Sequence, residues 1–333
     1  MKSRKVALVT GGAGFIGSHM VDLLLKQGFT VRVIDNLSGG RERNLADHTS
    51  NPNLTFEERD IRDLDPHESF FRSVDFVFHF AGLGDIVPSI ENPSEYMSTN
   101  VLGTTKVLEC CRHNPVQKLV YAASSSCYGI AKTPTDEFHP IDTKYPYAFS
   151  KYLGEQAVFH WGRVYGIPVN SIRIFNAYGT RSRTSGAYGA VFGVFLKQKL
   201  EGAPFTVVGD GSQRRDFLYV TDVARAFLAA AESKVTDRIF NLGAGQPQTV
   251  NRLVELLGGD VIYIPKRPGE PDCTWANISR ITSELDWEPI VNFDAGVGKI
   301  LEDIEYWREA PLWDKDSIGL ATESWFKHMN ETR

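Results

Sequence analysis

Short apolar runs alternate with longer amphipathic stretches through the first half of this 333-residue chain. Apolar runs rich in β-branched residues predict strands, and apolar residues at every third or fourth position predict helices. In chain order we expect a strand at 6–10 and a helix at 15–27, a strand at 31–35, a strand at 76–81 and a helix at 96–112, a strand at 119–124 and a helix at 147–165, and a strand at 169–175. This alternation favours an α/β fold, with a doubly wound parallel sheet covered by helices on both faces.

The regular alternation ends after residue 176, where the chain becomes rich in glycine. Isolated strand-like segments at 205–208 and 261–264 stand among helical ones, which indicates a second, smaller lobe of mixed α/β structure. A helical segment at 221–232 and an apolar run at 239–242 look as if they return to the first lobe. We therefore predict one lobe from residues 1–176 and about 219–244, and a second from about 177–218 and 245–333.

Composition and charge argue against several classes of protein. Hydrophobic residues make up 42% of the chain and charged residues 23%, so intrinsic disorder is not expected. The formal net charge of −5 argues against a nucleic-acid partner. No stretch reaches the roughly 18 uninterrupted apolar residues of a membrane helix, and the first residues do not resemble a secretory signal. We expect a cytoplasmic protein without a membrane partner.

The cysteines and histidines form no disulfide or metal motif. The four cysteines, Cys110, Cys111, Cys127 and Cys273, include no CxxC pair, and we expect all four to be reduced. The eight histidines show no HExxH spacing. The sequence therefore predicts no metal site.

A glycine-rich segment follows the first expected strand and begins the first expected helix. Glycines in this position let backbone amides approach a pyrophosphate at a helix N-terminus. The residues that we assign to dinucleotide binding here are Gly11, Gly14, Phe15, Ile16 and Gly17. The alternative, a tight turn without a ligand, is disfavoured because the strand and helix that this motif requires are both expected.

Asp35 ends the next expected strand, eighteen residues after Gly17. A carboxylate in that place accepts hydrogen bonds from a ribose 2′-hydroxyl and repels a 2′-phosphate, so we predict NAD in preference to NADP. Asp60 and Ile61 follow another short strand and are predicted to contact the adenine, although an exposed loop aspartate is the commoner explanation.

Tyr147 and Lys151 are four residues apart in an expected helix, so their side chains lie one turn apart on the same face. A phenol has an ordinary pKa near 10, and a neighbouring ammonium together with an oxidised nicotinamide would favour its ionised form. Tyr147 could then take a proton from an alcohol during hydride transfer. The alternative is a surface tyrosine beside a solvated lysine.

Three hydroxyls, those of Ser124, Ser125 and Ser126, stand at the end of the strand expected at 119–124. In open α/β sheets, ligands bind beyond the carboxyl ends of the strands. A serine there can hydrogen-bond the same alcohol as Tyr147. The alternative is a polar strand end whose side chains bond to their own backbone.

Through these and further motifs, the chain resembles the extended short-chain dehydrogenases/reductases of the nucleotide-sugar epimerase and dehydratase group over nearly its whole length. The segments that carry the resemblance are 10–17, 35–38, 79–82, Asn100, 124–129, 147–151, 173–179, 209–217 and 267–270. It implies a Rossmann-type sheet, bound NAD and a nucleotide-sugar substrate. It also implies a homodimer, paired through the two long helices at 96–112 and 147–165.

The resemblance implies a role for each matched residue. Ser124 and Tyr147 act on the sugar 4-hydroxyl and Lys151 on the nicotinamide ribose. Further cofactor contacts are expected at Asn36, Phe80, Ala81, Gly82 and Asn100. Substrate contacts are expected at Ser125, Ser126, Asn176, Arg215 and Arg267. The two arginines also fit on physical grounds, because planar bidentate donors suit the oxygens of a diphosphate, although a surface ion pair is the ordinary role of such residues.

Among the reactions of the group, we favour 4-epimerisation through a transient 4-keto sugar, with the hydride passed to bound NAD and returned to the opposite face. The 4,6-dehydratases carry Asp and Glu where this chain has Ser125 and Ser126, and the decarboxylases keep the Glu. Hydroxyls without an activating partner are poor general acids and bases. The 3,5-epimerases carry Cys in place of Ser126. Cys127 is one residue away, so we predict that it is a core residue.

The sugar is less well defined by the sequence. By the resemblance, Thr274 is the gate that limits the sugar pocket, and its small size would admit a 2-acetamido group. UDP-Glc/UDP-Gal and UDP-GlcNAc/UDP-GalNAc therefore both remain open, as do UDP-glucuronate and deoxy- or heptose sugars, because Asn277 and Gly84 depart from the pattern of many UDP-galactose 4-epimerases. A net-redox reductase, or a sensor that binds NAD(P) without catalysis, would be alternatives outside this chemistry.

The C-terminal stretch 305–326 carries three of the six tryptophans of the chain. Buried aromatic side chains usually belong to cores. We expect this stretch to pack against the second lobe.

Overall fold

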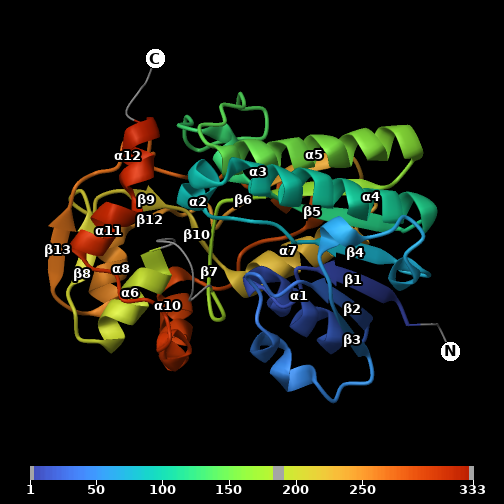
Figure 1. Cartoon of the computed structure of the whole chain (residues 1–333), viewed down its shortest axis with the longest axis horizontal. Helices are drawn as coiled ribbons and strands as arrows, with labels where there is room; N and C mark the ends of the chain where they lie inside the picture. The colour runs from blue at the N-terminus through green and yellow to red at the C-terminus, as the bar shows by residue number, and fades with distance from the viewer. Residues whose placement is uncertain (1–3, 183–190, 330–333) are drawn as a thin grey trace.

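The computed structural model describes residues 4–182 and 191–329 of the chain. Its largest element is a seven-stranded sheet in which every strand is parallel to its neighbours, in the order β11-β6-β5-β4-β1-β2-β3 (Figure 1). The strands are β1 (Val6–Thr10), β2 (Thr30–Asp35), β3 (Leu54–Glu58), β4 (Phe76–His79), β5 (Lys118–Ser124), β6 (Val169–Ile174) and β11 (Arg238–Leu242). From β1 the sheet first grows outward through β2 and β3, and then in the opposite direction from β4 onward. The point between β1 and β4 where the strand order reverses creates a crevice at the carboxyl ends of the strands, where such folds bind ligands.

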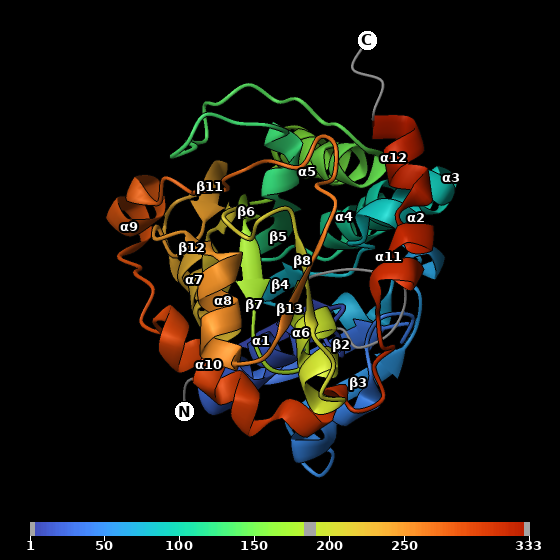
Figure 2. The ribbon, with the colours of Figure 1, turned by 90° about the vertical axis from the view of Figure 1, so that its left-hand side faces the viewer.

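Helices cover both faces of this sheet (Figures 1 and 2). On one face lie α1 (Phe15–Lys26) and α7 (Val220–Glu232); on the other lie α2 (Ile86–Glu91), α3 (Pro93–Met97), α4 (Thr104–His113) and α5 (Pro146–Tyr165). Successive residues of β1 enter opposite cores: Ala7 and Val9 pack with α1 and α7, and Leu8 packs on the side of α4 and α5. Both faces are therefore buried, which explains the continuous apolar runs and confirms the predicted doubly wound α/β sheet.

The helix expected at 96–112 is interrupted. Between α3 and α4 the turn Ser98–Gly103 is wound as a π-helix, a feature that often marks functional sites. It contains Asn100, which is 1% exposed and bonds to both backbone groups of Leu83. This contact lies outside the helix itself, so hydrophobic periodicity could not indicate it.

The second half of the chain forms three small strand pairs and a group of helices. The strands are β7 (Asn176–Tyr178), β8 (Phe205–Val208), β9 (Arg214–Arg215), β10 (Phe217–Tyr219), β12 (Gln248–Thr249) and β13 (Val261–Ile264). The helices are α6 (Val191–Leu200), α8 (Val250–Leu257), α9 (Ser279–Leu285), α10 (Phe293–Glu302), α11 (Lys315–Ala321) and α12 (Glu323–Met329). Most of them share a core of their own, in which the ring of Tyr178 contacts those of Phe192, Phe217 and Phe293. Helix α9 instead packs into the core of the large sheet.

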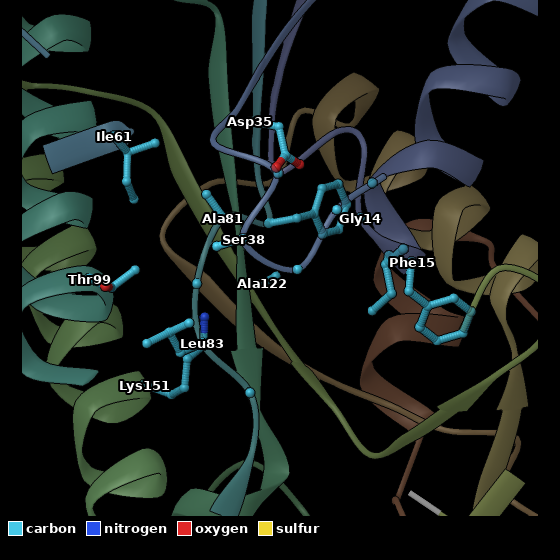
Figure 3. A pocket seen from close by; sticks show the side chains of 18 of the residues that line it. Gly14, Phe15, Asp35, Ser38, Ile61, Ala81, Leu83, Thr99, Ala122 and Lys151 are labelled. Atoms are coloured by element: carbon cyan, nitrogen blue, oxygen red, sulfur yellow. The ribbon is translucent and has the colours of Figure 1, made fainter. Parts of the chain in front are cut away.

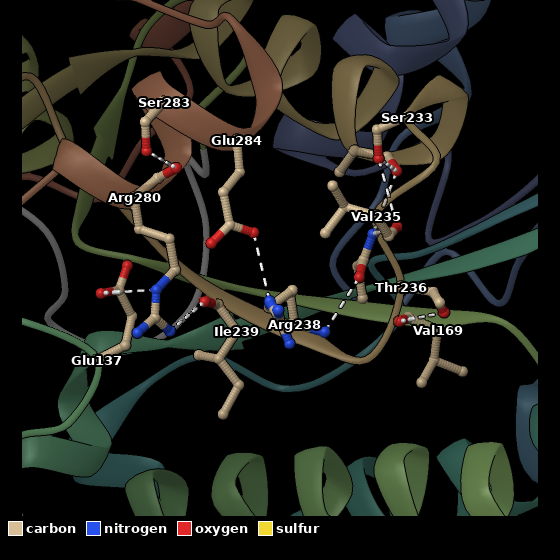
Figure 4. A network of polar contacts seen from close by, with 12 residues as sticks. Glu137, Val169, Ser233, Val235, Thr236, Arg238, Ile239, Arg280, Ser283 and Glu284 are labelled. Carbon is tan, nitrogen blue, oxygen red and sulfur yellow. Dashed lines mark hydrogen bonds and ion pairs between the residues drawn. The ribbon is translucent and has the colours of Figure 1, made fainter.

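The chain returns to the first sheet before it ends. Strand β11 pairs with β6, and α7 packs beside α1. A polar network ties this edge of the sheet to α9 (Figure 4): Arg280 donates to the Ile239 carbonyl at 3.1 Å and pairs with Glu137 at 3.6 Å, and Arg238 pairs with Glu284 at 3.3 Å. The lobe boundaries near residues 176, 219 and 244 stay a prediction.

The C-terminal stretch only partly matches its expected position. Trp307 is fully buried in the core of the second lobe, as expected. Trp325, on α12, instead contacts the ring of Tyr145, and Ser324 bonds to Glu91 on α2. Helix α12 therefore reaches across to the first lobe through Trp325 and Ser324.

No helix within residues 4–182 and 191–329 is long and apolar enough to cross a membrane. In the same ranges, no group of three or more His, Cys, Asp or Glu side chains is arranged to hold a metal ion.

Candidate active site

The turn between β1 and α1 has a backbone that only glycine fits. Gly11 has a φ of +69°, and a Cβ there would lie 2.7 Å from the Ala81 nitrogen. A Cβ on Gly17 would lie 2.1 Å from the Gly11 carbonyl oxygen. The turn therefore packs directly on the next strand end and leaves the first backbone amides of α1 open to an anion.

This turn forms one wall of a cleft with a volume of about 430 Å³ at the carboxyl ends of the strands (Figure 3). Asp35 and the glycine turn lie on one side of it, and Ile61, Thr99 and Lys151 on the other. Fifteen residues that the sequence assigned to cofactor binding or catalysis line it: Gly11, Gly14, Phe15, Ile16, Gly17, Asp35, Asn36, Asp60, Ile61, Phe80, Ala81, Gly82, Ser124, Tyr147 and Lys151. A glycine cradle with a carboxylate at its edge fits a dinucleotide.

Two carboxylates, those of Asp35 and Asp60, line the part of the cleft where the sequence predicts the adenosine. Asp35 accepts hydrogen bonds from the backbone amides of Ala13, at 3.0 Å, and Leu37, at 2.8 Å. Burial raises the pKa of Asp35, and these amides oppose the change. Asp60 is bonded to Arg62 and Asn36, and its contact with Arg62 lowers its pKa to about 2. Both groups are oriented by the protein before any ligand is considered.

Asn100 does not belong to the described lining of the cleft. Its amide nitrogen donates to the Leu83 carbonyl at 3.0 Å and to Ser150 Oγ at 2.9 Å, and its oxygen accepts from the Leu83 amide at 2.8 Å. Leu83 does line the cleft. Asn100 is thus placed to hold Leu83 in position, and a direct cofactor contact stays a prediction.

Ser124, Tyr147 and Lys151 meet at the other end of the cleft. Ser124 ends β5, and Tyr147 and Lys151 project from the first turns of α5. Ser124 Oγ lies 2.8 Å from Ser126 Oγ, and both serine side chains interact with the Tyr147 phenol. Ser125 begins the short turn after β5 and is partly exposed. Chain segments more than twenty residues apart therefore assemble one cluster of hydroxyls beside an amine.

Burial dominates the electrostatics of this cluster. It raises the pKa of Tyr147, and the contacts with Ser124 and Ser126 act in the opposite direction. It lowers the pKa of Lys151 to about 7, against the attraction of Glu155 one turn further along α5. The expected ionisation of Tyr147 is thus not favoured by the residues of the chain alone, because desolvation penalises the charged forms of both groups.

The buried residues His79 and Cys127, behind the cluster, are uncharged near neutral pH. Burial and the charge of Lys151 lower the pKa of His79 to about 3. Its ring bonds to Thr10 at 2.6 Å and Thr104 at 2.9 Å. Cys127 is 2% exposed, and burial raises its pKa to about 12, so it is a core residue, as predicted.

Four of the predicted substrate residues make polar contacts in two separate groups. Thr274 donates from Oγ1 to Asn176 Oδ1 at 2.6 Å. Arg215 pairs with Glu270 at 2.7 Å, and Arg267 approaches the other oxygen of the same carboxylate at 3.4 Å. The two arginines thus lie within reach of one anionic group. Sequence reasoning passed over Glu270, although it closes the motif that contains Arg267.

A second residue that the sequence interpretation missed is Tyr145. Its ring stacks on that of Tyr147, with centroids 6.4 Å apart and planes 8° apart. The Trp325 ring also contacts Tyr145, with centroids 6.1 Å apart. The only sequence signal was the position of Tyr145 two residues before Tyr147, which in a helix would place the two side chains on different faces.

The sheet, the glycine turn and the Ser, Tyr and Lys cluster define a dinucleotide-dependent enzyme of the Rossmann type. Residues 7–243 match the NAD dependent epimerase/dehydratase family. The chain belongs to this family, as its resemblance predicted, and its cofactor is NAD.

Similar proteins and structures support the same conclusion. A Methanocaldococcus jannaschii protein, provisionally named UDP-glucose 4-epimerase, is 38% identical over 88% of this chain and 96% of its own length. The Thermotoga maritima UDP-glucose 4-epimerase crystallised with UDP-glucose is 34% identical, covers 91% of this chain and 99% of its own, and has a TM-score of 0.83. The Bacillus cereus UDP-glucuronic acid 4-epimerase crystallised with UDP-glucuronic acid and NAD is 30% identical, covers 90% of this chain and 99% of its own, and has a TM-score of 0.84.

Other relatives carry other names, including a UDP-N-acetylglucosamine 4-epimerase, a UDP-glucuronic acid decarboxylase and a dTDP-glucose 4,6-dehydratase. Membership of the family therefore establishes an NAD-dependent enzyme of the nucleotide-sugar epimerase/dehydratase type, and it leaves the reaction to be argued from the site.

Proposed function

We propose that this enzyme is a nucleotide-sugar 4-epimerase. The observation that carries the proposal is the hydroxyl cluster itself: Ser124 is followed by Ser125 and Ser126, where dehydratases need an acid and a base. Ser124 and Ser126 are bonded to each other at 2.8 Å and face Tyr147. Such a cluster suits the exchange of one proton with a sugar hydroxyl, and it offers no carboxylate for the loss of water.

In this mechanism Tyr147 Oη takes the proton from the sugar 4-hydroxyl, while Ser124 Oγ holds the same oxygen in place. Lys151, whose pKa of about 7 leaves it partly protonated near pH 7, would bind the nicotinamide ribose, and its protonated form would favour the ionised form of Tyr147. Bound NAD supplies the hydride acceptor and donor. Tyr147 returns the proton after the 4-keto sugar has presented its other face, so there is no net redox change.

The second part of the proposal concerns the substrate. Arg215 and Arg267 would bind the diphosphate, and Glu270, which holds both in the structure, would orient them. Three of these relatives are named as 4-epimerases of UDP-glucose or UDP-N-acetylglucosamine, which supports UDP-Glc/UDP-Gal or UDP-GlcNAc/UDP-GalNAc here. UDP-glucuronate is the alternative substrate, because a relative named UDP-glucuronate 4-epimerase is 31% identical over 94% of the chain.

The test is anaerobic NMR of the purified enzyme with UDP-, GDP-, CDP- and dTDP-hexoses, UDP-glucuronate and N-acetylhexosamines, without added cofactor. We expect the 4-epimer as the single product, without added cofactor, because NAD co-purifies with the enzyme. A 4-keto-6-deoxy product would overturn the proposal and would point to Asp85, a carboxylate that lines the cleft near Tyr147, as a base for dehydration. Steady consumption of free cofactor would instead indicate a net reductase.

We further propose that the enzyme is a homodimer paired through α4 and α5. Several large apolar side chains on this side of the molecule are exposed: Leu102 by 50%, Phe149 by 44%, Val164 by 56% and Tyr165 by 43%. Exposed apolar patches of this kind mark interaction sites. Light scattering should give the dimer mass for the wild type and the monomer mass for Phe149→Glu. Ile290→Glu, at a residue that is 70% exposed away from these helices, should stay dimeric.

A further inference from the structure

Tyr145 and Tyr147 lie side by side because α5 begins between them. Residues two apart in a helix point in different directions. Tyr145 precedes Pro146, the first residue of α5, and its backbone is extended, with φ −145° and ψ 161°. This start turns the Tyr145 ring onto that of Tyr147, parallel to within 8°. The site therefore contains a second phenol, for which the proposed reaction has no role.

Ser126 lies close enough to both phenols to act on the pKa of each. Its side chain interacts with both Tyr145 and Tyr147, and it lies 2.8 Å from Ser124 Oγ. A serine hydroxyl has one proton to donate and two lone pairs that accept. If Tyr145 donates to Ser126, the Ser126 proton is free to point toward Tyr147 or Ser124. The four hydroxyls then form a chain that ends on the group that must lose its proton.

Other groups near Tyr147 work against its ionisation. Asp85, from the loop before α2, and Cys127, after β5, raise its pKa, and burial raises it most. Tyr96, from α3, contacts the edge of its ring, and Lys151 lies one turn further along α5. Of the contacts that act most strongly on Tyr147, those with Ser124 and Ser126 lower its pKa. The direction of these two hydroxyls therefore matters for catalysis.

Tyr145 itself is suited to remain a donor. Burial raises its pKa, and so do Tyr147, Glu270 and Cys127, which face it. It therefore keeps its proton at any pH at which the enzyme works. Unlike Tyr147, it can offer a permanent hydrogen-bond donor to Ser126.

Helix α12 also contacts Tyr145. The Trp325 ring lies against Tyr145, is 5% exposed, and donates from Nε1 to the Pro268 carbonyl at 2.7 Å. The guanidinium of Arg267 lies 5.6 Å from the centre of the same ring. One tryptophan thus contacts both a phenol beside the reacting hydroxyls and an arginine assigned to the diphosphate.

We propose that Tyr145 is a positioning residue of this site, which directs the Ser126 hydroxyl toward Tyr147, and that Trp325 on α12 fixes the Tyr145 ring for this purpose. The proposal rests on the proposed function only in taking Tyr147 as the base.

The first test is the dependence of kcat/KM on pH in Tyr145→Phe, which keeps the stacked ring and removes the hydroxyl. The rate rises with pH as Tyr147 loses its proton, so weaker support of the phenolate moves the midpoint upward. We expect a shift of about half a pH unit, or about a threefold loss below the midpoint, with rates that converge at high pH. Tyr263→Phe, at a phenol that is 60% exposed on β13, should leave the profile unchanged.

A loss that is the same at every pH would overturn the proposal, because it would show that Tyr145 acts only through packing. Trp325→Leu should shift the midpoint in the same direction as Tyr145→Phe, and an unchanged midpoint would remove Trp325 from the proposal. Trp325→Phe, which keeps an aromatic ring against Tyr145, should restore most of the wild-type profile.

A second readout does not depend on turnover. The ultraviolet difference between the wild type and Tyr147→Phe, titrated with pH in the NAD-loaded protein, reports the ionisation of Tyr147. The same difference in a Tyr145→Phe background should titrate at higher pH, and an identical titration would overturn the inference. If no sugar is epimerised, this titration still decides the role of Tyr145. Epimerisation with an unmoved titration would leave the proposed function in place.

Discussion

The side of the site predicted to hold the cofactor is built mainly from backbone, whereas the side predicted to hold the substrate is built from side chains that bond to one another. On the first side, positions 11 and 17 accept only glycine, because a Cβ on Gly11 or Gly17 would lie 2.7 or 2.1 Å from main-chain atoms. On the second, Ser124 bonds to Ser126 and Thr274 bonds to Asn176. A backbone surface follows from the fold and can serve every reaction of a family. Side-chain contacts can be exchanged one at a time, so we expect the reaction and the sugar to be decided there.

The largest expected effect tests the cofactor side. In Gly17→Ala the new methyl group would meet the Gly11 carbonyl oxygen, and neither backbone can move without disturbing the turn. We expect the loss of NAD binding by at least about 100-fold, or no folded protein, as judged by the NAD content of the purified enzyme and by calorimetry. Gly298→Ala is the matched control, since it also lies in a helix and its Cβ would point into open space. Normal NAD binding by Gly17→Ala would contradict a backbone-built cofactor side.

The second prediction tests the substrate side. Tyr147→Phe removes the hydroxyl that exchanges the proton and keeps the ring. We expect kcat to fall by about 10²- to 10⁴-fold, the usual contribution of a general base, while bound NAD is retained. The measurement is single-product NMR turnover beside the absorbance of the released cofactor. Tyr152→Phe, on the same helix, should keep its activity. Intact turnover in Tyr147→Phe would remove this residue from the mechanism.

The same division explains how much the sequence could predict. Every cofactor residue assigned from contiguous motifs, such as Gly14 and Asp35, lines the cleft, because a strand, a tight turn and a helix are determined locally. Six of the seven strands of the large sheet were likewise predicted to within a few residues, whereas β3 was expected only as a short strand before Asp60, without bounds. Asn100 shows the limit, because it lies in the π-helical turn and bonds to Leu83, and only the tertiary structure supplies that partner.

On the substrate side, local patterns were insufficient. Trp325 reaches Tyr145 from 180 positions further along the chain, and Glu270 meets Arg215 across 55. Neither contact has a periodicity or a spacing that a sequence shows. The direction of the Tyr147 pKa was also not predictable, because it depends on how completely the phenol is buried.

Lys151 stands where the two sides meet, and it tests whether the site is maintained at a cost in stability. Its pKa is about 7 in the folded protein against an ordinary 10.5, so the unfolded chain binds a proton that the folded one releases. This cost is largest below about pH 7 and disappears toward pH 10.5, so the stability of the wild type should rise with pH across this window. Lys151→Met should therefore be more stable than the wild type near pH 7, in the absence of NAD.

Urea unfolding between pH 7 and 9.5 measures this difference. The advantage of Lys151→Met should shrink steadily as the pH rises. Lys299→Met, at an exposed position on α10, should differ from the wild type by an amount that does not depend on pH. A Lys151→Met variant less stable than the wild type at pH 7 would show that the amine is better solvated than its burial indicates.

The smallest effect distinguishes two ways in which Thr274 can act on the sugar. As a gate, it would act through its size; as a hydrogen-bond donor to Asn176 Oδ1 at 2.6 Å, it would act by turning the Asn176 amide nitrogen toward the substrate. Thr274→Val keeps the size and removes the hydroxyl, whereas Thr274→Ser keeps the hydroxyl and removes a methyl group. Because the contact belongs to a substrate side built from side-chain bonds, we expect Thr274→Val to lower kcat/KM by about three- to tenfold, the usual net worth of one hydrogen bond, and Thr274→Ser to stay near the wild type. The ratio of kcat/KM for UDP-GlcNAc and UDP-Glc should change little in either variant. A Thr274→Ser variant that gains preference for the N-acetylated sugar, beside an unaffected Thr274→Val, would show instead that the pocket selects by volume.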